Sequence, residues 1–135
     1  MRCSSLVFVL LVLSGCESAE KMSSHQEVAT PITLTAKQIS SVRAGVAKSL
    51  KDHDLEAVKV GRMRAGRIST SVIVCGYVNG KNSSGEYVGE KPFHGLFMGM
   101  DNASGFIVTG TGGTDNDNVA TFEVCRHSGL NLAPS

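Results

Sequence analysis

The side chains best suited to binding chemistry lie between Tyr77 and Phe93. Tyr77, Asn79 and Lys81 alternate along the chain, so in an extended segment their side chains lie on one face. The amide and the ammonium group donate hydrogen bonds, and the tyrosine offers a flat apolar surface with a polar end. Such a face can hold a peptide, a glycan or an anionic group. The whole candidate binding strip consists of Tyr77, Asn79, Lys81, Asn82, Tyr87, Lys91 and Phe93.

The same strip also has a structural interpretation. Asn79 and Asn82 stand among Gly80, Gly85 and Gly89, and asparagine and glycine favour turns that need positive φ angles. The two tyrosines of the strip can equally cover the edge of a core. The residue types alone leave both interpretations open.

Motifs of known catalytic sites are absent from the sequence. There is no GxSxG, no HExxH and no phosphate-binding loop. The segment 110–113 is rich in glycine but lacks the lysine of a P-loop, and the segment 115–118 lacks the later glycine and glutamate of a calcium loop. The sequence therefore predicts a protein that is not an enzyme and that has no metal and no cofactor. The alternative is a small hydrolase or ligand carrier with a pocket near His94.

The amino terminus has the pattern of a secretory signal peptide. Arg2 precedes an unbroken apolar run, Leu6 to Leu13, and small residues follow it. A transmembrane helix needs roughly twenty apolar residues, so this run is too short to span a bilayer. The segment Leu13-Ser14-Gly15-Cys16 resembles the lipobox of bacterial lipoproteins.

The lipobox resemblance implies that Cys16 is acylated and that the signal peptide is cut just before it. Two or three acyl chains, at roughly 0.8 kcal/mol per buried methylene group, would anchor the protein stably in a membrane. Glu17 follows Cys16, which favours the outer membrane, since an aspartate at this position tends to retain lipoproteins at the inner membrane. We therefore expect a lipid-anchored protein of the bacterial cell envelope that faces the periplasm.

Removal of the signal peptide leaves 12 basic and 12 acidic residues. This neutral balance argues against a nucleic-acid partner and against an anionic membrane surface as the ligand. Cys3 leaves with the signal, so Cys75 and Cys125 remain beside the lipidated cysteine. An even pair in an exported domain indicates a disulfide. The lack of a CxxC motif or a nearby histidine cluster argues against a redox pair or a metal site.

The mature chain divides into a flexible tether, residues 16–32, and a single globular domain, residues 33–135. A capping box of Thr35 and Gln38, followed by the apolar residues Ile39, Val42, Val46 and Leu50, predicts a helix that ends near residue 52. Strands are expected over 55–65, 68–78, 93–100 and 106–109, and a second helix over 119–128. This order predicts an α+β fold, a small antiparallel sheet of about four strands with both helices packed on one face.

The strip lies in a longer motif that resembles a family of small, uncharacterised proteobacterial envelope proteins. Their shared pattern is Cys-Gly-x-Val-Asn-x-Lys-Asn, then Gly-x-Tyr-x-Gly and a Pro-Phe pair. The matching residues here are Cys75, Gly76, Val78, Asn79, Lys81, Asn82, Gly85, Tyr87, Gly89, Pro92 and Phe93. The resemblance implies an exported location and a shared fold, and it implies no particular activity.

These observations favour a non-enzymatic accessory lipoprotein that binds an envelope protein or a cell-wall partner through the strip. Two alternatives remain beside the hypothesis of a binding protein. One is the carrier or hydrolase with a pocket near His94, and the other is a purely structural component of the envelope.

Overall fold

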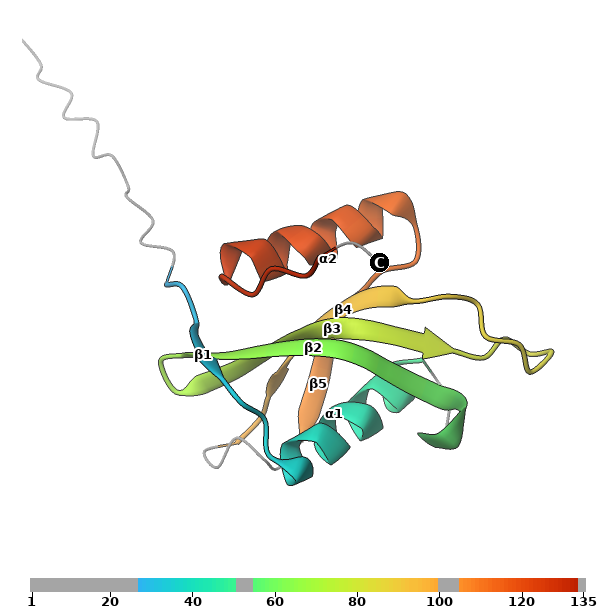
Figure 1. The fold of residues 1–135 in the computed structure, drawn as a ribbon, viewed down its shortest axis with the longest axis horizontal. Helices are drawn as coiled ribbons and strands as arrows, with labels where there is room; N and C mark the ends of the chain where they lie inside the picture. Colours follow the sequence, from blue (N-terminus) through green and yellow to red (C-terminus); the bar gives the residue numbers. More distant parts are fainter. Residues whose placement is uncertain (1–26, 51–54, 100–104, 134–135) are drawn as a thin grey trace, which may run out of the picture.

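A five-stranded antiparallel sheet lies between two helices (Figure 1). The structure, a computed structural model, describes residues 27–50, 55–99 and 105–133. Its elements are β1 (Thr30–Ile32), α1 (Ala36–Ser49), the short 3-10 helix η1 (Leu55–Ala57), β2 (Val58–Ile68), β3 (Ser71–Gly80), β4 (Lys91–Phe97), β5 (Phe106–Thr111) and α2 (Asp115–His127). The strands follow one another in chain order across the sheet. The α+β class is therefore confirmed.

The sheet has five strands where the sequence predicts about four. The additional strand is β1, which pairs with residues 65–67 of β2, and Ala29 just before it is 3% exposed. The predicted tether of residues 16–32 thus includes residues that belong to the sheet. Three residues are too few to show an alternating pattern, so β1 gives no signal in the sequence. Cys16, the predicted signal peptide and the tether up to residue 26 lie outside the described residues.

The two helices cover opposite faces of the sheet, and the prediction of one shared face is wrong (Figure 1). Neighbouring residues of β3 show this directly. Val74 packs in the cluster that includes α1, whereas Cys75 packs against α2, and both are 0% exposed. Side chains of successive strand residues point to opposite faces. The nearly continuous apolar run of β3 is typical of a strand that is buried on both sides.

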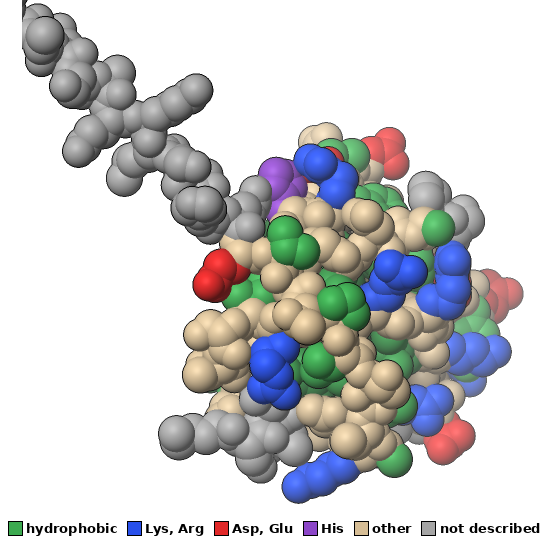
Figure 2. Space-filling view, turned by 60° about the vertical axis from the view of Figure 1, so that its left-hand side comes forward, with side chains coloured by type: hydrophobic (Ala, Val, Ile, Leu, Met, Phe, Trp, Pro, Cys, Tyr) green, Lys and Arg blue, Asp and Glu red, His purple; other side chains and the backbone are tan. Residues whose placement is uncertain are grey.

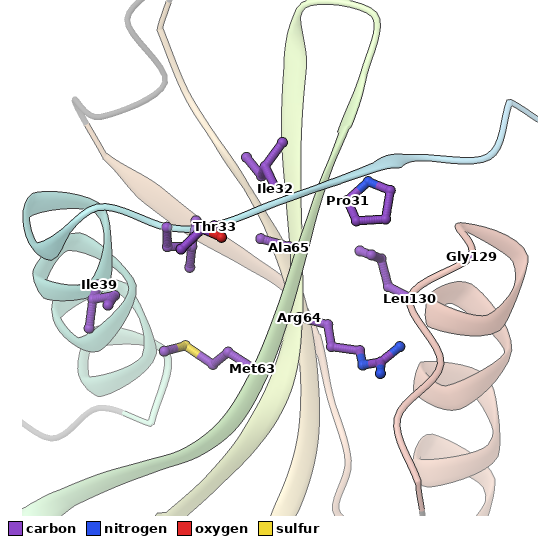
Figure 3. Close-up of a pocket in the computed structure, with 10 residues that line it drawn as sticks. Pro31, Ile32, Thr33, Ile39, Met63, Arg64, Ala65, Gly129 and Leu130 are labelled. Carbon is purple, nitrogen blue, oxygen red and sulfur yellow. The ribbon is translucent and has the colours of Figure 1, made fainter.

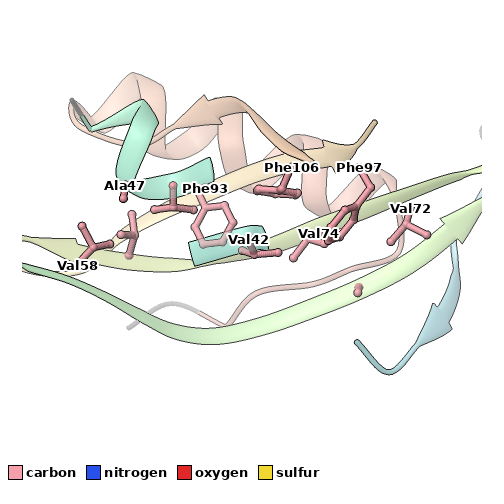
Figure 4. Close-up of a cluster of buried hydrophobic side chains, with 11 residues drawn as sticks. Val42, Ala47, Val58, Val72, Val74, Phe93, Phe97 and Phe106 are labelled. Carbon is pink, nitrogen blue, oxygen red and sulfur yellow. The ribbon is translucent and has the colours of Figure 1, made fainter. Parts of the chain in front are cut away.

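The larger core lies between the sheet and α1. Three phenylalanines fill its centre: the Phe93 and Phe106 rings have centroids 6.2 Å apart, and those of Phe97 and Phe106 lie 5.3 Å apart (Figure 4). The other buried residues of this core are Val42, Val46, Ala47, Val58, Ala65, Val72, Val74 and Val78. The smaller core on the α2 side contains Ala29, Cys75, Cys125 and Leu130.

The predicted start of α1 is confirmed, because Thr35 and Gln38 form a reciprocal capping box. Its apolar face is narrower than predicted. Val42 and Val46 are buried and Leu50 packs against the core, whereas Ile39 is 37% exposed. The first predicted strand break, at residues 66–67, is displaced, since the hairpin turns at Ser69, which has a φ of 53°.

Helix α2 begins earlier than the predicted residue 119. Thr114 is its N-cap, and Asp117 completes a capping box as the third helical residue. The cap is therefore a threonine and not an aspartate. Thr121 and Cys125 form the inward face of the helix, whereas Val119 is 60% exposed.

Candidate functional site

The predicted disulfide is confirmed and joins the sheet to α2. Cys75 of β3 is bonded to Cys125 of α2, with a Cα–Cα distance of 6.0 Å. After α2, Gly129 adopts a φ of 74°, and the amide of Leu130 donates to the carbonyl oxygen of Cys125. This helix end, a Schellman motif, turns the chain back so that Leu130 packs beside the disulfide.

The strip does not form one continuous surface, because Tyr77 is buried beneath α2. Its side chain is 1% exposed, and its ring meets that of Phe122 edge to face at a centroid distance of 6.3 Å. The phenol donates a hydrogen bond to the carbonyl oxygen of Ala133 in the C-terminal segment. Tyr77 therefore fixes that segment against the sheet and is not available to a partner.

Phe93 is also buried, and on the opposite face of the sheet. It is 0% exposed and lies in the α1-side core. Its inclusion in the binding strip is corrected for a simple geometric reason. Phe93 pairs with Gly76 in the β3–β4 ladder, so it faces the other way from Tyr77.

Asn79 and Asn82 hold the loop between β3 and β4. The Asn79 side-chain oxygen accepts a hydrogen bond from the amide of Gly89. The Asn82 side-chain oxygen accepts from the amides of Ser84 and Glu86. Gly85 and Gly89 have φ angles of 82° and 102°. For these residues the structural interpretation of the strip, a turn built by asparagine and glycine, is confirmed.

Lys81 and Tyr87 are the strip residues that reach the surface of this loop together. They face each other across an isolated antiparallel bridge. Lys59 of β2 joins them, since its Nζ lies 4.1 Å from the centroid of the Tyr87 ring and the Nζ of Lys81 lies 5.3 Å from it. Tyr87 is 36% exposed. We call Lys59, Lys81 and Tyr87 the loop surface.

Lys91 lines a hollow on the α1 side of the loop, to which Lys81 of the loop surface also contributes. The hollow has a volume of about 310 Å³, and its walls include Leu50 from the end of α1 and Val88 from the loop. Val88 is 52% exposed. The remaining lining residues are Val78, Gly80 and Asn82.

Strand β2 carries a row of cations that the sequence analysis did not single out. Lys59, Arg62 and Arg64 are exposed, and within the described ranges neither of the ion pairs involves them, since both are made by Glu123 at the end of α2. Figure 2 shows Lys and Arg side chains outnumbering acidic ones on the visible face. The small net charge of the whole chain, +1, gives no indication of this local excess of cations. The available signal was the spacing Lys-x-x-Arg-x-Arg in a predicted strand.

A groove of about 600 Å³ lies where β1 crosses the edge of β2 (Figure 3). Figure 3 shows Met63 directed toward α1 and Arg64 directed toward the α2 side of β2. The lining residues are Pro31, Ile32, Thr33, Leu34, Ile39, Met63, Arg64, Ala65, Gly129 and Leu130. The sequence gives no sign of this groove, because it depends on β1.

His94 lies away from both hollows. It is half-buried on β4, in the register position beside Cys75, so it lies on the α2 side of the sheet. Its ring packs against Gly110 of β5, and its buried Nδ1 has no hydrogen-bond partner among the described residues. Burial lowers the pKa of His94 below the ordinary value of 6.5.

The lowered pKa of His94 predicts a loss of stability in mild acid. The folded state favours the neutral ring, so as the pH falls below 6.5 the unfolded chain takes up this proton first. The stabilising effect is complete above pH 6.5 and is lost as the pH falls through the lower pKa of the folded state. Urea unfolding at a series of pH values should show a smaller decline below pH 6.5 for His94→Gln than for wild type. Equal declines for both proteins would refute this role.

The described part of the chain offers neither a metal centre nor a membrane-spanning helix. No group of three or more metal-ligating side chains lies together there, and none of its helices is long and apolar enough to cross a membrane. Searches of protein-family models, curated proteins and solved structures found no match to this chain.

Proposed function

We propose that this chain is a lipid-anchored accessory protein of the bacterial envelope that binds a partner protein or cell-wall polymer through its loop surface. The observation that carries the proposal is the exposed Tyr87 ring with the ammonium groups of both Lys59 and Lys81 close to it, at 4.1 and 5.3 Å from its centroid. Tyrosine is one of the residue types that most often dominate the energy of protein interfaces.

The order of the loop strengthens this proposal. The side chains of Asn79 and Asn82 bond to loop amides, so the loop is held in shape before a partner arrives. Binding then costs less conformational entropy than it would for a flexible loop. The three groups of the loop surface suit a partner that carries carboxylates, because each ammonium group can donate to one of them and the tyrosine covers apolar surface.

Export and anchoring are supported by the amino-terminal pattern and by the disulfide. A buried disulfide such as Cys75–Cys125 is characteristic of proteins that fold in an oxidising compartment. We expect cells that express the wild-type chain to incorporate labelled palmitate into it, and Cys16→Ser to abolish the label. Persistent labelling of the Cys16→Ser protein would contradict the anchor.

The binding surface can be mapped by a photo-crosslinking amino acid placed at single positions in living cells. At Tyr87, an aromatic photo-crosslinker should give a discrete adduct with the partner. At Val119, which is 60% exposed on α2 and on another part of the molecule, the same group should give none.

The crosslinking experiment also separates the alternative functions. A purely structural component predicts no discrete adduct at either position. An adduct at Val119 in place of Tyr87 would move the binding surface to α2 and contradict the proposal. A carrier or hydrolase with a pocket at His94 would require space there, and the hollows described above are lined by other residues.

A further inference from the structure

Strand β2 has a free edge beside β1. On that side, β1 pairs only with residues 65–67, although β2 begins at Val58. Among the residues that the structure describes, none forms a neighbouring strand for residues 58 to 64 on the side away from β3. An unpaired strand edge is a template for an additional strand.

Pro31 indicates which backbone groups of β2 face this edge. Proline has no N–H, so the β1–β2 ladder must be formed by Thr30 and Ile32, which are opposite Arg67 and Ala65. Hydrogen-bonding groups in an antiparallel strand face a given side at every second residue. Continuing the series from Arg67 and Ala65, Met63 presents its N–H and C=O to the free edge.

The two faces of this edge differ in chemistry. On the α1 side, Met63 lies in the groove with the apolar side chains of Ile32, Leu34 and Ile39 (Figure 3). On the α2 side, Arg64 occupies the position opposite Cys75, and Arg62 lies over the Tyr77 ring at 5.5 Å from its centroid. A strand added here would meet apolar side chains on one face and guanidinium groups on the other.

We propose that the free edge of β2 binds an extended peptide segment of a partner protein, in which acidic and apolar side chains alternate. The peptide adds to the sheet beyond the end of β1 and pairs with Met63. Its apolar side chains enter the groove, and its carboxylates meet Arg62 and Arg64. Main-chain hydrogen bonds then supply affinity, and the alternating side chains supply selectivity. This site goes beyond the proposed function, since it includes no residue of the loop surface.

Charge argues for an acidic segment and against a second copy of this chain. Antiparallel pairing of two β2 edges would bring the arginines of both copies together, and like charges on paired strands are destabilising. Glu90 limits the basic stretch, because its carboxylate lies next to Gly61. The bulge between Val60 and Met63 interrupts the β2 ladder. The acidic segment therefore pairs at Met63 and Arg64, between this bulge and the end of the β1 ladder at Ala65.

The test uses the purified protein in detergent and a short fluorescent peptide in which glutamate and valine alternate. Fluorescence anisotropy should show saturable binding of this peptide. A lysine–valine peptide should bind with an affinity lower by at least about tenfold. The Arg62→Glu/Arg64→Glu variant should reverse the preference. Both arginines are exposed, so this variant should fold, which its thermal unfolding checks. Arg43→Glu/Lys48→Glu, at two exposed residues of α1, is the matched control and should bind as wild type does.

A third peptide separates strand addition from simple charge attraction. N-methylation of the glutamate–valine peptide at alternate residues removes the amides that a paired strand needs, and it should abolish binding. Equal binding of the methylated peptide would overturn the proposal, as would the absence of saturable binding or equal losses in both charge-reversal variants. If the protein self-associates and the Arg62→Glu/Arg64→Glu variant changes the strength of this self-association, the edge binds a second copy of the chain instead. None of these results alters crosslinking at Tyr87, so failure here is distinguishable from failure of the proposed function.

Discussion

The double substitution Cys75→Ala/Cys125→Ala is expected to lower the free energy of unfolding by about 4 kcal/mol. The two cysteines are 50 residues apart in sequence, so the bond removes much of the conformational entropy of the unfolded chain. Both side chains are 0% exposed between the sheet and α2. Small domains are stable by only about 5–15 kcal/mol, so the loss is large, and urea unfolding measures it.

Reduced wild-type protein is the control for the disulfide prediction. Its unfolding free energy should fall to that of the double variant, since both lack the same crosslink. Unchanged stability of the double variant would show that α2 is held to the sheet without the bond. Tyr77 and Phe122 already contact each other across this interface, so the comparison measures what the disulfide adds to that packing.

Phe93→Ala is expected to cost about 3–5 kcal/mol of unfolding free energy. The ring is fully buried and packs edge to face with Phe106, so the substitution leaves a cavity in the α1-side core. Thermal or urea unfolding measures the loss, with Tyr87→Ala as a matched aromatic control from the same predicted strip. Tyr87 is 36% exposed, and its removal should change stability by about 1 kcal/mol or less.

The comparison of these two aromatics distinguishes structural from surface residues. A small effect of Phe93→Ala would mean that the core collapses around the missing ring. A large effect of Tyr87→Ala would mean that the loop surface stabilises the fold, and its availability to a partner would then be in doubt.

The elements of this fold that can be predicted from sequence are those with a local signal. The capping box at Thr35 fixes the start of α1. The disulfide can be predicted because Cys3 and Cys16 belong to the amino-terminal pattern, which leaves Cys75 and Cys125 as one pair. β1 escapes prediction because its three residues gain their order only by pairing with β2. The placement of α2 on the opposite face escapes it too, since local periodicity says nothing of which face a helix covers.

The strip shows why residue type and spacing overestimate a site. Tyr77, Asn79 and Lys81 do alternate on β3 and its extension, as predicted, but α2 and the C-terminal segment cover Tyr77. On that face, Lys81 lies beyond the part that α2 and the C-terminal segment cover, and it reaches solvent. Lys59 could not be assigned to it from sequence, because it joins through the β2–β3 register, where it is opposite Asn79.

The most direct test of the loop surface is the yield of the Tyr87 crosslink in two charge-matched double variants. Lys59→Gln/Lys81→Gln removes the cations beside the ring, and Lys37→Gln/Lys48→Gln removes two exposed cations of α1. Both variants should retain the wild-type unfolding free energy within about 0.5 kcal/mol. We predict that the first loses most of the adduct and that the second keeps it. An equal yield from both variants would contradict the claim that this surface holds the partner.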